Sequence, residues 1–538
     1  MHFRKTLVCF GMLLLFIFAN HNAQAHTYAS DLKVTFSGRF TTGPAVISFT
    51  LNDKADNLIV RIKRNNAVVR TINAGAKAKG ANTVNWDGTG STGDGTYTFE
   101  IETSTTGYAA WTQIFDSDAI GIFTRGGDVV RNPALPRFGH WLAGDVGGGG
   151  FEKGISEWLA DGSPATPGQP LLLTPLLGAG QPWHLTVDDD GFIYFSDILN
   201  RRIYRLNSDL SNPKVVISGV KLPRGLHVRG AGADKTIYFA ADMSVFRAKI
   251  GTAEVFTGTP EKVLDADTYV RDVVLDDAGM MYVTLRTIDP ADSLDGGVTG
   301  FVNAYDISSI PAPFAFFSIP LGRPIGITIH RGANLTSATD DSIYVSLRAA
   351  GGVAAGIFKL NILQGTAHRV VDYSSSDANR RADLAVDPAG NIVWWENGDE
   401  HNYMFSPPGP SKYVTPNPPG QEIKVGTTAV EARNVTTIPG AFTLYPAYPN
   451  PFWSGATSPA KGGGNPSTKI RFDLAKAGPA LLRVFDLSGR EIATLVNARL
   501  ATGQHEYLWD ARNVPSGVYL YRLEALGYSA TGRVTLMK

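Results

Sequence analysis

Short segments in which every second residue is apolar run through most of the chain, separated by turns rich in Gly, Pro, Asn and Asp. In residues 95–102, the side chains of Tyr97, Phe99 and Ile101 fall on one face of an extended strand. Residues 517–524 repeat this pattern. Such alternation is typical of strands with one buried face. We therefore expect an all-β protein.

The two ends of the chain carry related units, each with a hairpin, a strand that ends in Trp-Asp, and an alternating strand. We predict an immunoglobulin-like β-sandwich at each end, with the Trp side chain in its core and the Asp bonding a turn. A carbohydrate platform at the Trp is the alternative. The matching pairs are 60–72 with 482–495, Trp86-Asp87 with Trp509-Asp510, and 95–102 with 517–524.

A different repeat lies between about residues 118 and 440. The repeated pattern is an entry turn, a short apolar strand, an acidic hairpin turn, a strand built around Ile-Tyr, and a third strand. Six copies of roughly 50 residues approach the length of a four-stranded blade, so we expect a six-bladed β-propeller. The copies are 121–145, 180–206, 223–242, 270–283, 323–346 and 382–395.

The first 25 residues predict a secretory signal. Two basic residues precede an apolar run over 7–19, and small residues follow it. The run is shorter than the ~20 residues that span a bilayer, so we expect no transmembrane segment in the mature chain. The predicted cleavage site comprises Ala23, Ala25 and His26.

Composition narrows the chemistry. The single cysteine, Cys9, lies in the predicted signal, so we expect no disulfide, thiolate metal site or cysteine nucleophile in the mature chain. The chain has 49 basic and 49 acidic residues. This balance disfavours nucleic acid as a partner.

Two histidines and four acids are candidate channel or rim residues of the propeller. His184 and His227 fall at equivalent places in adjacent blades, where they are expected to line the channel. A metal or acid/base pair is possible there, but we favour pore-lining side chains. The acids end the second strand of their blades, and we favour turn caps over a shared site. They are Asp145, Asp197, Asp242 and Glu396.

Asp188-Asp189-Asp190-Gly191 invites a calcium interpretation. It lacks the alternating spacing and distal Glu of an EF-hand loop, whereas acids followed by Gly suit a tight hairpin. We favour the hairpin and expect no cofactor, with calcium as the alternative. No metal site is assigned.

The units at both ends resemble the immunoglobulin-like domain of the flagellar hook-capping protein. The C-terminal copy is similar to the type A sorting domain of type IX secretion substrates, apart from an insertion over 453–464. The residues that carry the sorting motif are Tyr448, Pro449, Asn450, Pro451, Phe452, Gly489, Gly517, Tyr519 and Lys538.

This resemblance implies passage to the periplasm and then across the outer membrane by the type IX machinery. The protein would be secreted or held at the cell surface, where lipopolysaccharide, a glycan or a protein could be a partner. The propeller units resemble NHL-repeat and YWTD-type propellers, and more distantly regucalcin-like lactonases and streptogramin lyases. The metal ligands of the regucalcin-like enzymes find no match here, so that activity is not transferred.

The leading hypothesis is a non-enzymatic binding or scaffold protein that contacts its ligand through the propeller. An extracellular enzyme acting on a lactone, glycan or polymer is one alternative, and a structural component of a surface layer or appendage is the other. Acids with perturbed pKa values around the two histidines would favour the enzyme. The expected regions are a signal peptide over 1–25, a sandwich over 26–117, the propeller over 118–405 or to 440, a connector over 406–441, and the sorting sandwich over 442–538.

Overall fold

The computed structural model is all-β and falls into two compact units, residues 1–426 and 427–538. The structure describes residues 26–117, 124–145, 153–165, 171–178, 180–276, 278–287, 300–308, 317–331, 341–348, 354–361, 364–372, 382–396, 401–426, 443–445, 447, 450, 452–453, 467–476, 478–500, 503–525 and 528–537.

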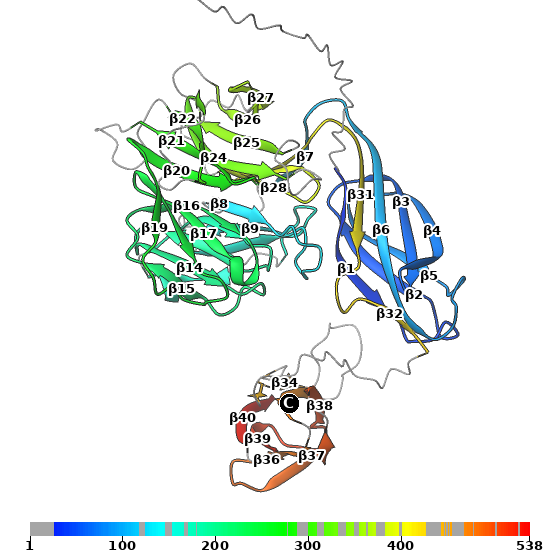
Figure 1. Ribbon diagram of the computed structural model, residues 1–538. Coiled ribbons are helices and arrows are strands. Elements are labelled where there is room, and N and C mark those ends of the chain that lie inside the picture. The colour runs from blue at the N-terminus through cyan, green and yellow to red at the C-terminus, as the bar shows by residue number, and fades with distance from the viewer. Residues whose placement is uncertain are drawn as a thin grey trace, which may run out of the picture. The chain divides into compact units, whose positions relative to one another are not determined.

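The middle of the first unit is a six-bladed propeller (Figure 1). Each blade is a four-stranded antiparallel sheet, and the innermost strands of neighbouring blades lie side by side around the ring. The prediction of six blades is confirmed. The blades are β8 (Thr124–Val129), β9 (Trp141–Asp145), β10 (Gly154–Trp158) and β11 (Leu171–Leu172); β12 (Pro182–Val187), β13 (Ile193–Asp197), β14 (Arg202–Leu206) and β15 (Lys214–Ser218); β16 (Pro223–Arg229), β17 (Thr236–Ala241), β18 (Ser244–Lys249) and β19 (Glu261–Asp265); β20 (Tyr269–Leu275), β21 (Met280–Arg286), β22 (Gly300–Asp306) and β23 (Phe317–Pro320); β24 (Arg323–His330), β25 (Ser342–Arg348), β26 (Gly356–Asn361) and β27 (Thr366–Asp372); and β28 (Ala382–Val386), β29 (Ile392–Glu396), β30 (Asn402–Ser406) and β7 (Thr112–Ser117). A short helix, α1 (Thr174–Leu177), follows β11.

The ring closes because the segment that enters the propeller and the segment that leaves it form one sheet. Strand β7 precedes the first blade in sequence, yet it pairs with β30 as the outer strand of the last blade. The propeller sheets therefore begin before the expected start at residue 118. This closure gives the last blade its fourth strand. It also gives the first blade a neighbour on each side, which a blade needs in order to bury both of its faces.

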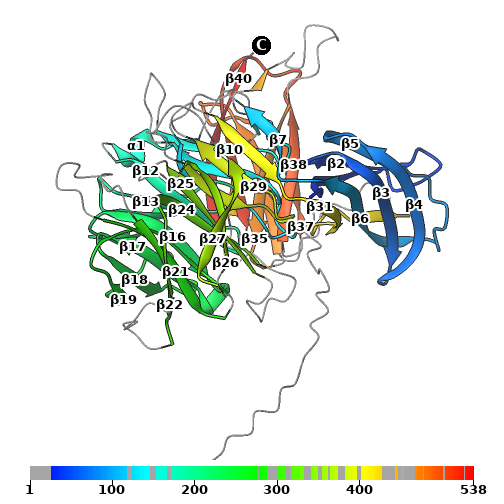
Figure 2. The same cartoon turned by 90° about the horizontal axis from the view of Figure 1, so that it is seen from above.

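The first sandwich has two sheets (Figure 2). Asn65 and Asn66 both have positive φ and form a two-residue turn in the hairpin that the sequence predicts. Trp86 is fully buried, as expected, and its ring lies 5.1 Å from that of Tyr97. The strands are β1 (Ala29–Thr35), β2 (Ala45–Leu51) and β5 (Gly80–Trp86) in one sheet, and β3 (Ala55–Arg64), β4 (Ala67–Lys77), β6 (Gly95–Tyr108), β31 (Gly409–Pro416) and β32 (Ile423–Val425) in the other.

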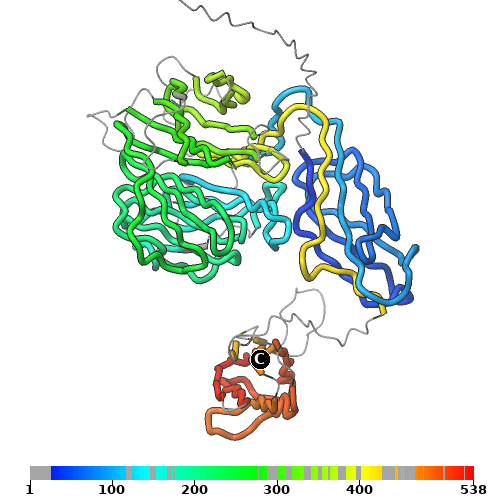
Figure 3. Tube along the Cα trace, in the orientation of Figure 1, coloured from blue at the N-terminus to red at the C-terminus, as the bar shows by residue number. Residues whose placement is uncertain are grey.

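Strands β31 and β32 come from the far side of the propeller in sequence. Both pair with β6, and Figure 3 shows the returning chain running along the sandwich. The connector expected over 406–441 was therefore wrong in its first part, because residues 409–416 and 423–425 form strands. The propeller is an insertion within the first sandwich.

The second unit is a sandwich that repeats two internal contacts of the first. Trp509 is buried, and its ring lies 5.2 Å from that of Tyr519. The hydroxyl of Tyr519 donates to the carbonyl four residues earlier, as that of Tyr97 does. The strands are β33 (Thr443–Leu444), β35 (Ser467–Leu474) and β38 (Gly503–Asp510) in one sheet, and β34 (Phe452–Trp453), β40 (Tyr528–Met537), β39 (Gly517–Ala525), β36 (Gly478–Phe485) and β37 (Glu491–Leu500) in the other.

The paired carboxylates after the Trp residues bond turns, as expected. Asp87 Oδ1 accepts from the amide of Thr89 at 2.9 Å. Asp510 Oδ1 accepts from the amide of Arg512 at 3.1 Å. The repeat seen in the sequence therefore extends to hydrogen bonds within each sandwich.

An ionic cluster joins the first sandwich to the propeller. The ring of His140 contacts Glu157 of β10 through Nδ1 at 2.6 Å, and Asp31 of β1 through Nε2 at 2.8 Å. Burial opposes a charge on His140, but the two carboxylates outweigh it and raise its pKa to about 9. The interaction therefore favours the charged imidazolium at neutral pH.

An apolar cluster lies at the same junction. The Tyr28 ring lies 5.4 Å from that of Phe138 and 5.8 Å from that of Tyr413 in β31. Together with His140, these rings fix the sandwich against the propeller.

We predict that Ile423→Ala destabilises the protein by about 2–5 kcal/mol, because a fully buried side chain is removed from the core of the first sandwich. Urea denaturation followed by tryptophan fluorescence measures the change. The control is Lys424→Ala on the exposed face of β32. Equal midpoints for the two variants would show that β32 does not belong to this core.

We also predict a pH-dependent stability contribution from His140. Its raised pKa makes this contribution full below about pH 6.5 and absent above about pH 9, with a size of at most about 3 kcal/mol. The free energy of unfolding of wild type should exceed that of His140→Gln at low pH. This difference should decrease as the pH rises from about 6.5 to about 9. A difference that stays flat would contradict the ionic cluster.

Candidate functional site

The innermost strands place glycine and ionisable side chains in alternation around the propeller axis. His184, Asp272 and Asp383 come from β12, β20 and β28, which belong to alternate blades. Glycines from the intervening strands β8, β16 and β24 face them. These glycines are Gly126, Gly225 and Gly326.

The three glycines leave the space that the carboxylates occupy. A methyl group on Gly225 would lie 2.1 Å from Asp272 Oδ1, and one on Gly326 would lie 2.0 Å from Asp383 Oδ1. Both distances are well inside van der Waals contact. Small residues at these positions are therefore a steric requirement of the axial cluster.

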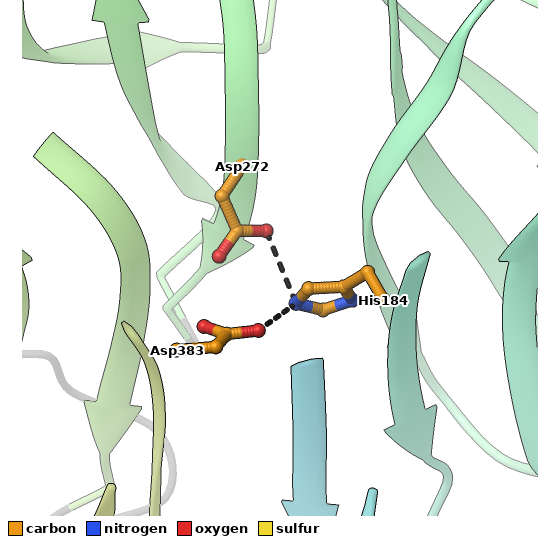
Figure 4. Close-up of side chains that lie close together, drawn as sticks. All are labelled: His184, Asp272 and Asp383. Atoms are coloured by element: carbon orange, nitrogen blue, oxygen red, sulfur yellow. Dashed lines mark ion pairs between the residues drawn. The ribbon is translucent and has the colours of Figure 1, made fainter. Parts of the chain in front are cut away.

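The axial cluster of His184, Asp272 and Asp383 is shown in Figure 4. His184 Nε2 lies 3.4 Å from Asp272 Oδ1 and 3.4 Å from Asp383 Oδ2. Each carboxylate also accepts the amide N–H of the residue that follows it. Asp272 Oδ2 accepts the amide of Ile327 in β24 at 3.0 Å. The cluster thereby connects four blades across the axis.

Protonation of the cluster is set by burial and mutual charge. Burial disfavours a charged His184, but the two carboxylates outweigh it and raise its pKa to about 9. Burial raises the pKa of Asp383 to about 7. His184 Nε2 carries a proton between the two carboxylates in both the charged and the neutral ring, and in the neutral ring Nδ1 accepts the amide N–H of Leu226 at 3.3 Å.

The cluster has the spacing of a metal site, but the nitrogen that faces the two carboxylates, His184 Nε2, carries a proton and offers no lone pair. Its ligand atoms lie within 4.8 Å of one another, and 3.4 Å is about the separation of two ligands on a tetrahedral ion. A metal would need the lone pair of His184 Nε2, which carries the proton in this arrangement. In this arrangement the three side chains form an ion-paired cluster around His184 Nε2.

A cavity of about 440 Å³ opens at one end of the axis. His184 and His227 both line it. The two histidines are not at equivalent places, which corrects the sequence alignment: His184 is opposite Ser196 of its neighbouring strand, whereas His227 matches Thr186 in the pairing register. His227 therefore lies two residues further along its strand and is outside the axial cluster.

The sandwich contributes to the cavity wall. Tyr413 of β31 lines the cavity together with Asp387 and Pro388 of the last blade. Burial and the nearby Asp387 raise the pKa of Tyr413 well above its ordinary value, so its hydroxyl stays protonated. The return of the chain to the sandwich thus helps to shape the cavity.

The acidic hairpin at Asp188 to Gly191 is held by a lysine. Lys235 Nζ lies 2.5 Å from Asp188 Oδ2 and 2.9 Å from Asp190 Oδ2. Asp188 Oδ1 accepts the amide of Phe192, and Gly191 has the positive φ of a tight turn. An ammonium group therefore occupies the place where the calcium interpretation would put an ion.

Two of the four candidate rim acids, Asp197 and Asp242, have partners that the structure describes. Asp197 Oδ1 accepts three backbone amides at its turn. Asp242 forms an ion pair with Lys221. Asp145 is buried at the end of β9. Glu396 ends β29, and its side chain lies outside the part that the structure describes.

Several sorting-motif residues have structural roles within the second sandwich. The side chain of Asn450 bonds the β40 backbone twice, through the carbonyl of Arg533 and the amide of Thr535. Phe452 is buried against Trp509. Gly489 has a positive φ in a hairpin turn.

Two further residues of the predicted motif lie on β39. Gly517 is the first residue of this strand and pairs with Leu536, and Tyr519 is buried. The remaining motif residues lie outside the described residues. They are Tyr448, Pro449, Pro451 and Lys538.

Of the predicted cleavage site, the structure describes His26 alone. Ala23 and Ala25 lie outside the described residues. His26 is fully buried, and its carbonyl accepts the side-chain amides of Asn52 in the sandwich and Asn391 in the last blade, at 2.8 and 2.9 Å. Burial lowers the pKa of His26.

Residues 34–107 match the FlgD Ig-like domain family. This match covers most of the first sandwich before the propeller insertion. It supports the resemblance seen in the sequence for that unit. No curated protein matches the chain.

Several solved structures match the chain at low similarity. Virginiamycin B lyase from Staphylococcus aureus is 12% identical, with 57% of this chain and 99% of that chain covered and a TM-score of 0.34. PorZ, a surface component of the type IX secretion system of Porphyromonas gingivalis, is 13% identical, with 82% and 58% covered and a TM-score of 0.30. Hydrazine synthase from Kuenenia stuttgartiensis is 16% identical, with 52% and 74% covered and a TM-score of 0.33.

We predict that Gly326→Ala destabilises the protein by about 1–3 kcal/mol through its clash with Asp383 Oδ1. Combining it with Asp383→Ala removes the clashing atoms, so the two effects should not add. A double-mutant cycle in urea measures the coupling. Strict additivity would show that Gly326 and Asp383 do not meet at the axis.

Proposed function

We propose that this protein is exported by a type IX secretion system and serves outside the cell as a non-enzymatic binding protein. The ligand would enter the axial cavity of the propeller. The N-terminal signal pattern and the C-terminal motif support the export route. In the described residues, no helix is long and apolar enough to cross a membrane.

The cavity is the observation that carries the binding proposal. Its volume of about 440 Å³ falls in the range of small-molecule sites. Its wall combines apolar side chains of the innermost strands with charged and hydroxyl groups. Rigid strands hold this wall, which keeps the site formed before a ligand arrives.

An enzyme acting on a lactone, glycan or polymer is the second candidate, because acids surround His184 as that hypothesis requires. The geometry favours binding over catalysis. Both nitrogens of His184 already face protein partners, namely the Leu226 amide and the two carboxylates. Asp272 and Asp383 are also absent from the described lining of the cavity.

Export is tested by deleting residues 443–538 in a host with a type IX system. We expect the truncated protein to accumulate in the periplasm. The same residues fused to a periplasmic reporter should carry the reporter to the surface. Efficient export of the truncated protein would contradict the sorting role.

Binding is tested by filling the cavity. Val274 lines it, so Val274→Phe should abolish the thermal stabilisation given by those ligands that stabilise residues 26–538 of wild type. The ligand panel contains saccharides, organic acids, amino acids and short peptides. The control is Val255→Phe at an exposed position. Ligands that stabilise both variants equally would place the binding site elsewhere.

A further inference from the structure

Of the four carboxylates that line the cavity, those of Asp128 and Asp387 are already engaged by protein donors, and that of Asp189 faces Arg331 at 3.9 Å. Asp128 accepts from Arg131, Thr186 and the amides of Val129 and Val187. Asp387 accepts two backbone amides and the side-chain amide of Asn391. These carboxylates therefore have little capacity left for a ligand cation or donor.

The cations of the wall still face the cavity. Arg131 donates Nε to the Val386 carbonyl and Nη2 to Asp128, which leaves further N–H groups of a side chain that is 37% exposed. Arg331 is 30% exposed and lies 3.9 Å from the carboxylate of the exposed Asp189. Both arginines line the cavity.

His227 lies within the field of these arginines. Its Nε2 is buried and forms no hydrogen bond in the part of the chain that the structure describes. Burial, together with the positive charges of Arg331 and Arg131, lowers the pKa of His227 to about 3. A positive potential that suppresses protonation of this imidazole would stabilise an anion beside it.

The remaining wall is apolar. Leu226, Val274, Ile327 and Leu384 all line the cavity. A ligand with a hydrocarbon or ring body would bury that body against these side chains. A bare inorganic ion would leave them in contact with water.

We infer that the cavity binds a small organic oxyanion, a carboxylate, sulfate or phosphate attached to an apolar or ring-shaped body. Arg331 and Arg131 would hold the anionic group, His227 Nε2 would donate to it, and the apolar wall would contact the body. Planar guanidinium groups suit these oxyanions because two N–H groups can donate in parallel. This inference rests on the proposed binding function and adds the ligand class.

The test compares matched acids and neutral analogues on residues 26–538. The probes are benzoate with benzamide, glucuronate with glucose, and glucose 6-phosphate with glucose, measured by isothermal titration calorimetry. At least one acid should bind at least tenfold more tightly than its neutral analogue, and added salt should weaken it. Arg331→Gln should weaken that acid at least tenfold. Arg247→Gln, whose arginine pairs with the exposed Glu261 away from the cavity, should have no effect.

The outcomes separate the two proposals. Neutral analogues that bind as tightly as the acids, or an Arg331→Gln variant with unchanged affinity, would overturn the oxyanion inference while the binding function stands. Acid binding that survives Val274→Phe would place the ligand outside the cavity and overturn both. Failure of every acid to bind would overturn the oxyanion inference. Since Arg331 and its partner Asp189 are both partly exposed, the variant is expected to fold.

Discussion

The pairing of β31 with β6 is the contact on which the rest of the first unit depends. It makes the propeller an insertion in the sandwich, so both ends of the ring are tied to one sheet. The same return places Tyr413 in the wall of the cavity and beside Tyr28. A freely linked propeller would have neither contact. The geometry of the site therefore depends on a strand that lies outside the ring.

Around the axis of the ring, glycine and ionisable residues alternate from one innermost strand to the next. Ionisable residues on three innermost strands meet at the centre because the three strands between them carry glycine. In chain order, the second, fourth and sixth blades each carry an acid that accepts a backbone amide at the hairpin after the innermost strand. These acids are Asp188, Asp276 and Asp387. The propeller thus has a two-blade repeat in addition to its single-blade repeat. The paired pattern keeps charged side chains in the centre without steric conflict.

Much of this fold follows from the sequence. Period-two alternation, the Trp-Asp pairs and the repeat near 50 residues predict the sandwiches and the six blades, because each reports a local burial pattern. The return of β31 and β32 was missed because proline-rich flanks resemble a connector and long-range strand pairing leaves no local signal. His184 was identified, but Asp272 and Asp383 were missed, although a column through the aligned innermost strands contains them. That column alternates Gly with His or Asp, and recognising it required the exact register.

The most direct test of the account is a disulfide between β6 and β31. Residues 26–538 contain no cysteine, so Ser104→Cys with Lys412→Cys introduces a single pair at partners in the strand register. Opposed residues on antiparallel strands have Cα atoms about 4.5–5.5 Å apart, within the range that a disulfide spans. Peptide mapping by mass spectrometry under non-reducing conditions should find the two tryptic peptides cross-linked in folded, oxidised protein. Two free thiols that both remain reactive in the folded protein would contradict the return of the chain to the first sandwich.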